Sequence, residues 1–164
     1  MSLTETNVAT DREVHITRTF NAPRELVFKA WTEPGQLEQW FAPSGCEIRY
    51  VSIDLRQGGA YHSCLTTPTG YECWCRGDYL EVTPPQRIVM TMAVADEAGN
   101  MVQPVDAGMD PDWPAETIVT IDFAEDGGKT TITLHQTVSE ELAKKTGAYP
   151  SWLSMFDRLE SLVA

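Results

Sequence analysis

YPSWLSMFDRLESLVA, residues 149–164, is the stretch that decides the fold. Its apolar residues recur at the spacing of one helical face, which carries Trp152, Met155, Phe156, Leu159, Leu162 and Val163. The charged residues 157, 158 and 160 take the opposite face. Pro150 suits a first helical turn, where its missing N–H costs no hydrogen bond. The stretch therefore predicts an amphipathic helix whose broad aromatic side must be covered by a large apolar surface.

The natural cover is a β-sheet, because apolar and polar residues alternate with a period of two from residue 46 onward. We predict six successive antiparallel strands at 46–55, 61–66, 71–82, 87–95, 115–124 and 130–138. A further strand is expected at 14–20, followed by two short helices, the second of which carries Leu37, Trp40 and Phe41. This order predicts an α+β fold in which a curved antiparallel sheet wraps around a long C-terminal helix.

Length and charge narrow the classes of function. The 164 residues suit one domain, expected at 13–164 after a flexible leader at 1–12. The net charge is −12 and no Lys/Arg cluster stands against it, so we expect no nucleic-acid partner. No apolar run approaches the roughly 20 residues that a membrane span needs, and no secretion signal is visible. The sequence therefore predicts no membrane span and a cytoplasmic location.

Several short motifs together resemble a known family. They are FNAPRELVFKAWT at 20–32, Trp40-Phe41 with Pro43, GGAY at 58–61, GDYLEV at 77–82, PPQRIV at 84–89, ETIVT at 116–120, and Trp152 followed by FDRL at 156–159. As a set they resemble the family related to the C-terminal domain of the heat-shock protein 90 ATPase activator. That family belongs to the START and polyketide-cyclase-like (SRPBCC) superfamily. The resemblance spans roughly residues 14–163 and implies a helix-grip fold, in which the sheet encloses a hydrophobic cavity against the last helix.

The resemblance leaves three functions open. The first is a protein that binds a small apolar or aromatic molecule in the cavity. The second is an interaction module that contacts the chaperone, as an ATPase activator does. The third is a cavity enzyme of the cyclase or aromatase type. The sequence contains no nucleophile elbow, phosphate loop, metalloprotease motif or dinucleotide fingerprint, so we assign no catalytic residues, metal or cofactor.

The helix-grip arrangement predicts which residues form the cavity wall. We expect Trp40, Phe41, Tyr61, Ser63, Leu65, Glu72, Trp74, Arg76, Met92, Trp113, Trp152, Met155 and Phe156 there. The aromatic members suit a ligand wall, but equally suit ordinary core packing. Trp113 lies in a long loop, 96–114, where it is either a lid residue or an anchor for the loop.

The predicted hairpin between 61–66 and 71–82 decides which residues face inward. A turn centred on Pro68 and Thr69 places Leu65 opposite Glu72, residue 63 opposite 74, and residue 61 opposite Arg76. That register directs Glu72 and Arg76 into the cavity. There they either fix a polar group of a ligand, pair with each other, or reach water at the rim of the cavity.

The same register bears on the cysteines. It places Cys64 opposite Cys73 and His62 opposite Cys75 on the outward face. Three thiols and an imidazole suit zinc chemically, but a square of side chains on a flat strand pair does not converge readily on one ion. We therefore expect free thiols rather than zinc or a disulfide. With Tyr79 they would make an outward apolar patch, which suggests a homodimer through this face.

Overall fold

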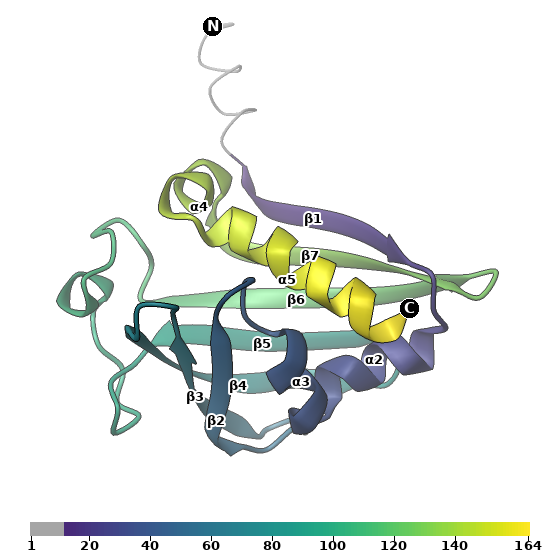
Figure 1. Ribbon diagram of the computed structural model, residues 1–164, viewed down its shortest axis with the longest axis horizontal. Coiled ribbons are helices and arrows are strands. Elements are labelled where there is room, and N and C mark those ends of the chain that lie inside the picture. Colours follow the sequence, from purple (N-terminus) through teal and green to yellow (C-terminus); the bar gives the residue numbers. More distant parts are fainter. Residues whose placement is uncertain (1–11) are drawn as a thin grey trace, which may run out of the picture.

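One curved antiparallel sheet of seven strands frames the protein in the computed structural model, which describes residues 12–164 (Figure 1). Its strand order is β1-β7-β6-β5-β4-β3-β2. The strands are β1 (Glu13–Phe20), β2 (Glu47–Ile53), β3 (Ala60–Thr66), β4 (Glu72–Thr83), β5 (Arg87–Val94), β6 (Glu116–Asp126) and β7 (Lys129–Ser139). Buried and accessible residues alternate along β7, as the period of two predicts. The predicted strands are confirmed, with ends that move by one or two residues.

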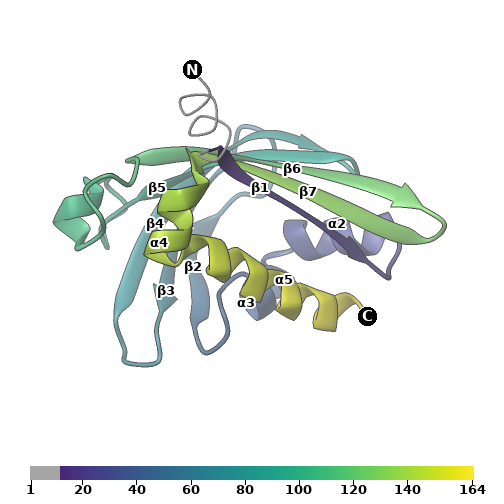
Figure 2. The ribbon, with the colours of Figure 1, turned by 90° about the horizontal axis from the view of Figure 1, so that it is seen from above.

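The helices lie on the concave side of the sheet (Figure 2). They are α2 (Arg24–Thr32), α3 (Pro34–Trp40), α4 (Glu140–Thr146) and α5 (Ala148–Val163), and a 3₁₀ turn, η1 (Pro104–Ala107), interrupts the long loop. The two short helices after β1 and the long last helix confirm the predicted order.

Helix α4 was not predicted from the sequence. Its Ser139 accepts a hydrogen bond from the Leu142 N–H at 3.2 Å, which caps the first turn, and Gly147 ends it at φ +90°. Both signals are readable in the sequence, but the helix is only two turns long. Helix α5 begins directly after Gly147.

The β3–β4 hairpin has a different register from the predicted one. The Thr67 N–H donates to the Tyr71 carbonyl at 2.9 Å, so the loop between these residues has three members, 68–70. Gly70 occupies the left-handed region at φ +88°, which is the usual third position of such a loop. The ladder therefore pairs Leu65 with Cys73 and Tyr61 with Gly77. Cys73, Cys75 and Tyr79 therefore face inward, and Glu72, Trp74 and Arg76 do not line the inner pocket, which reverses the predicted faces.

A cluster of aromatic rings fills the space between the C-terminal half of α5 and the sheet. Phe156 is fully buried and meets Phe20 and Trp31 at ring-centroid distances of 6.0 and 6.4 Å. Trp31 in turn packs against Phe123 at 6.0 Å and Trp40 at 4.7 Å. This cluster anchors α5 on the concave face, as expected of a helix-grip core.

Two further predictions concern the N-terminal leader and the lack of a membrane span. The predicted leader, 1–12, lies outside the described residues apart from Arg12, whose Nε is 3.1 Å from a Glu140 carboxylate oxygen. Among the helices of residues 12–164, none combines the length and the apolar character that a bilayer crossing requires.

Candidate functional site

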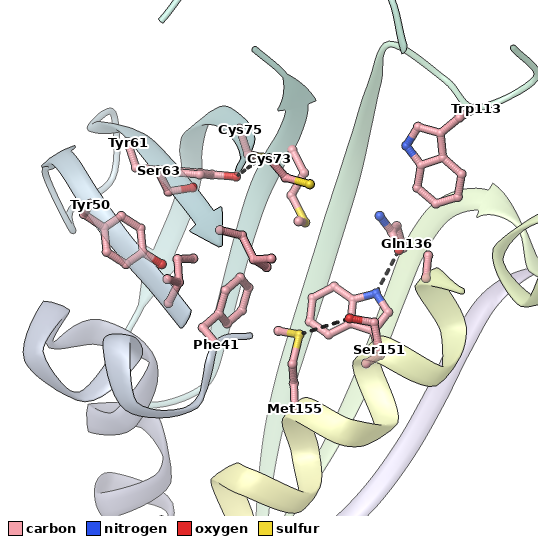
Figure 3. Close-up of a pocket in the computed structure, with 15 residues that line it drawn as sticks. Phe41, Tyr50, Tyr61, Ser63, Cys73, Cys75, Trp113, Gln136, Ser151 and Met155 are labelled. Carbon is pink, nitrogen blue, oxygen red and sulfur yellow. Dashed lines mark hydrogen bonds between the residues drawn. The ribbon is translucent and has the colours of Figure 1, made fainter. Parts of the chain in front are cut away.

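A pocket with a volume of about 190 Å³ lies between the N-terminal half of α5 and strands β2 to β5 (Figure 3). We call it the inner pocket. It is lined by Phe41, Ile48, Tyr50, Tyr61, Ser63, Leu65, Cys73, Cys75, Met92, Trp113, Gln136, Ala148, Ser151, Trp152 and Met155. Most of this surface is carbon and sulfur, which favours an apolar occupant.

Two periodicities build the walls of the inner pocket. On the sheet side every second residue of a strand faces inward, as with Tyr61, Ser63 and Leu65 on β3. On the helix side, residues 148, 151, 152 and 155 follow the spacing of one helical face. Ala148 and Ser151 are small, so the helix leaves space where its later turns carry large rings.

Gln136 ties the helix to the sheet at the pocket wall. Its amide oxygen accepts a hydrogen bond from the Trp152 indole N–H at 2.9 Å, and its amide nitrogen donates to the Thr117 hydroxyl at 3.0 Å. Gln136 is only 3% exposed. Because both of its polar groups are satisfied inside the protein, this amide fixes the orientation of the Trp152 ring.

Tyr61 lies across β4 because its partner in the ladder is a glycine. A Cβ on Gly77 would approach the Tyr61 ring to 2.6 Å and would also clash with the Thr91 carbonyl. With that space free, the Tyr61 hydroxyl donates to the Thr91 carbonyl at 3.0 Å and lies 3.7 Å from the Cys75 sulfur. The tyrosine thus forms a fixed floor of the pocket.

The inner pocket carries no ionised side chain among the described residues. No Asp, Glu, Lys, Arg or His lines it. Desolvation by burial raises the pKa of the Tyr50 and Tyr61 hydroxyls and of the Cys73 and Cys75 thiols. These groups therefore keep their protons at neutral pH and offer hydrogen bonds without charge.

A larger groove of about 690 Å³ adjoins the inner pocket beneath the loop between β5 and β6. We call it the loop-side groove. Both spaces are lined by Cys73, Cys75, Met92, Trp113 and Gln136, so they share a wall. The loop is held down where the Tyr71 hydroxyl donates to the Ala107 carbonyl at 2.9 Å. Trp113 stands where the two spaces meet.

The structure brings together much of the predicted wall. The predicted residues that line the inner pocket are Phe41, Tyr61, Ser63, Leu65, Met92, Trp113, Trp152 and Met155. Trp40 and Phe156 belong instead to the solid core, where both are fully buried. The Trp40 indole N–H donates to the Ala30 carbonyl at 2.9 Å, which fixes its ring away from the pocket.

The inward placement of Glu72, Trp74 and Arg76 is wrong because of the hairpin register. Trp74 packs on the outer face beneath the Arg49 guanidinium, 5.1 Å from the ring centroid, and Glu72 pairs with that Arg49 at 3.7 Å. Arg76 donates to the Gly99 carbonyl at 2.9 Å. Glu72 and Arg76 therefore do not pair with each other. Of the three residues, Glu72 and Trp74 line the loop-side groove, and none lines the inner pocket.

The cysteine arrangement also differs from the predicted one. All four cysteines are free, and Cys64 lies opposite Trp74, while Cys73 and Cys75 face inward. Residues 12–164 contain no cluster of His, Cys, Asp and Glu that suits a metal ion. Tyr79 is buried at 3% exposure. Cys73, Cys75 and Tyr79, three of the four residues that suggested a homodimer through an outward patch, thus point into the molecule, and Cys64 alone stays beside Trp74 on the outer face.

Sequence reasoning missed several wall residues, namely Ile48, Tyr50, Cys73, Cys75, Gln136, Ala148 and Ser151. Ala148 and Ser151 precede Trp152 and Met155 on the same helical face, so that spacing alone could have found them. Cys73 and Cys75 required the correct loop length, for which Gly70 was the signal. Gln136 carried no signal, because a polar residue on a strand is usually solvated.

Comparison with known proteins agrees with this architecture. The family model described as activator of Hsp90 ATPase homolog 1-like protein matches residues 21–164. The chain belongs to this family. Among curated proteins, none matches the chain at a significant level.

Solved structures share the fold at low sequence identity. A Staphylococcus epidermidis protein is 27% identical with a TM-score of 0.75, and the match covers 92% of this chain and 88% of that one. A Chromobacterium violaceum protein is 24% identical with a TM-score of 0.75, covering 92% and 95%. The AHSA1 protein of Silicibacter pomeroyi is 19% identical with a TM-score of 0.70, covering 92% and 96%. The fold is thus the helix-grip fold of the SRPBCC type.

Proposed function

We propose that this member of the family binds a small apolar or aromatic molecule in the inner pocket, between the sheet and α5. The observation that carries the proposal is the continuous apolar lining of a space of about 190 Å³. A fold that only needed stability would gain by filling this space, since each cavity forfeits dispersion contacts and apolar burial. The activator-like and cyclase-like alternatives rest on family resemblance alone.

The binding test uses N-phenyl-1-naphthylamine, a neutral fluorescent probe whose two ring systems suit the inner pocket and the adjoining groove. We expect one probe molecule per chain, with increased probe emission and a change in tryptophan emission, because Trp152 and Trp113 line the pocket. Titration of fluorescence against protein concentration gives the stoichiometry and the dissociation constant.

A matched pair of serines in α5 distinguishes the pocket from the protein surface. Ser151 lines the inner pocket, whereas Ser161 is exposed ten residues later, and the Ser161 hydroxyl donates only to the Asp157 carbonyl of its own helix. Ser151→Phe places a ring in the pocket, where it occupies space that the probe would use. Because the probe then buries less apolar surface, its binding should weaken at least about 10-fold. Ser161→Phe should change it less than about 2-fold. Equal effects of the two variants would contradict the proposed site.

A further inference from the structure

Ser63 carries a hydroxyl that is open to the inner pocket and makes no hydrogen bond to the protein among the described residues. Its side chain lines the inner pocket from β3 at 3% exposure. Within residues 12–164 it has no hydrogen-bond partner. An occupant without a polar atom would cover this hydroxyl and leave it unpaired, which is costly, so a serine here favours an occupant that pairs with it.

Tyr50 adds a second hydroxyl at the same end of the pocket. It is the direct ladder partner of Ser63 across β2 and β3, and it lines the same space. Figure 3 shows its ring with the hydroxyl turned toward the pocket interior. This hydroxyl likewise has no hydrogen-bond partner in the described part of the chain. By contrast, the neighbouring Tyr61 hydroxyl is committed to the Thr91 carbonyl.

The helix end of the pocket differs, because its polar groups are already paired. The Gln136 amide uses its oxygen for Trp152 and its nitrogen for Thr117. The Ser151 hydroxyl contacts the Met155 sulfur at 3.9 Å. The inner pocket therefore has one end with free hydroxyls, on β2 and β3, and one end with an aromatic and aliphatic lining, on α5.

We propose that the occupant is an uncharged, ring-sized molecule with a hydroxyl or carbonyl oxygen that hydrogen bonds to Ser63 and Tyr50, its apolar part lying against Trp152 and Met155. This rests on the proposed binding function and names the ligand class. An ionised ligand of either sign is disfavoured because no oppositely charged side chain lines the pocket, and an anion is disfavoured further by the net charge of −12. The size follows from the volume, since a dry cavity of about 150 Å³ holds one benzene ring.

Three matched ligands test the proposal, namely ethylbenzene, 4-ethylphenol and 4-ethylbenzoate, each measured by displacement of N-phenyl-1-naphthylamine at pH 7. The phenol is neutral at this pH and the benzoate is ionised. We expect 4-ethylphenol to bind about 2- to 10-fold more tightly than ethylbenzene, the range that one or two net hydrogen bonds supply. We expect 4-ethylbenzoate to bind at least about 10-fold more weakly than the phenol, because its charge stays unpaired.

Variants then test whether the ligand oxygen contacts the hydroxyls of Ser63 and Tyr50. Ser63→Ala and Tyr50→Phe each remove one hydroxyl with little change of volume, and the double variant should reduce the preference for the phenol to below about 2-fold while ethylbenzene binding is retained. Ser52→Ala, on the exposed part of the same strand β2, should leave the preference unchanged. Thermal melting of each variant checks that it is folded.

The outcomes separate this inference from the binding function. If ethylbenzene displaces the probe but the phenol gains nothing, or if its gain survives in the double variant, the inference is overturned and the binding function stands. Benzoate binding as tight as that of the phenol overturns the uncharged class. If the probe binds but none of the three ligands displaces it, the inference is overturned and the binding function stands. If the probe itself does not bind, the proposed function falls, and the inference falls with it.

Discussion

The two halves of α5 face the same sheet but meet different neighbours. The C-terminal half places Phe156 and Leu159, both fully buried, against a dense set of aromatic rings. The N-terminal half places Ala148 and Ser151 over the inner pocket. One helix thus covers a solid core at one end and a space at the other.

The difference shows that side-chain size and strand curvature together create the pocket. Strands β2 and β4 each contain an irregularity, after Tyr50 and after Tyr79, and such bulges increase local twist and bend the strand. Figure 2 shows β2 and β3 turning down beside the helix, away from the flatter part of the sheet formed by β6 and β7. Large rings close the gap beneath the flatter part. Small helix residues leave it open beneath the curved part.

The largest effect is expected from a substitution in the C-terminal half of α5, where the space against the sheet is filled. Phe156→Ala should lower the free energy of unfolding by about 3–5 kcal/mol, because it removes a ring from a close-packed site. The neighbouring Met155→Ala should cost less, at about 2 kcal/mol, because Met155 lies against the pocket and has fewer atoms to lose contact with. Urea denaturation measures both values. Equal costs would show that the two halves are packed alike, and a loss below about 1 kcal/mol for Phe156→Ala would show that its site is not close-packed.

A smaller effect is expected at the boundary between the halves. Gln136→Leu removes the acceptor of the Trp152 indole N–H and the donor to Thr117, so we expect a loss of about 1–3 kcal/mol for leaving buried polar groups unpaired. The Trp152 ring should also become free to turn. Fluorescence anisotropy and a double-mutant cycle with Trp152→Phe measure both consequences. A purely additive cycle would show that the hydrogen bond does not position the ring.

The smallest effect is expected from the protonation of the thiol and phenol groups near the pocket, which changes stability only above neutral pH. Burial raises the pKa of Cys75, Tyr50 and Tyr61 above their ordinary values of 9.0 and 10.0. On raising the pH the unfolded chain therefore loses these protons first, so the stability present below pH 9 is lost as the pH rises through the raised folded values.

Urea midpoints between pH 7 and pH 11 check this dependence. We expect them to be nearly constant at first and to fall above about pH 9, as the linkage between proton binding and folding requires. Cys75→Val should make the first part of the fall shallower, because it removes the group with the lower ordinary pKa. A midpoint that stays constant to pH 11 would contradict burial of these groups.

The sequence predicted the elements and their order because strong periodicities are local. The apolar spacing of residues 152–163 predicted α5, and the period of two predicted the strands. It also predicted that Trp152 and Met155 share a face with the pocket. Helix α4 and the 3₁₀ turn η1 escaped, since seven and four residues give too few repeats for a helical period to be visible.

The sequence did not predict which face of β4 lines the pocket, because both faces of that strand are mixed. One face carries Cys73, Cys75 and Tyr79, and the other carries Glu72, Trp74 and Arg76. Neither set is plainly apolar or plainly polar, so alternation alone could not choose between them. The division of aromatic residues between core and pocket was equally hidden. Trp40 and Trp152 look alike in sequence, and only packing separates them.

The three-residue loop 68–70 sets the register of the β3–β4 hairpin, and the register decides which side chains of β4 line the pocket. Gly70, in the left-handed conformation, suits the three-residue loop that accompanies the pairing of Leu65 with Cys73. A shift of this pairing by one residue would present Glu72, Trp74 and Arg76 to the interior in place of two thiols and a tyrosine. A one-residue difference in hairpin register thus separates a neutral wall from a charged one, with no substitution at any residue of the wall.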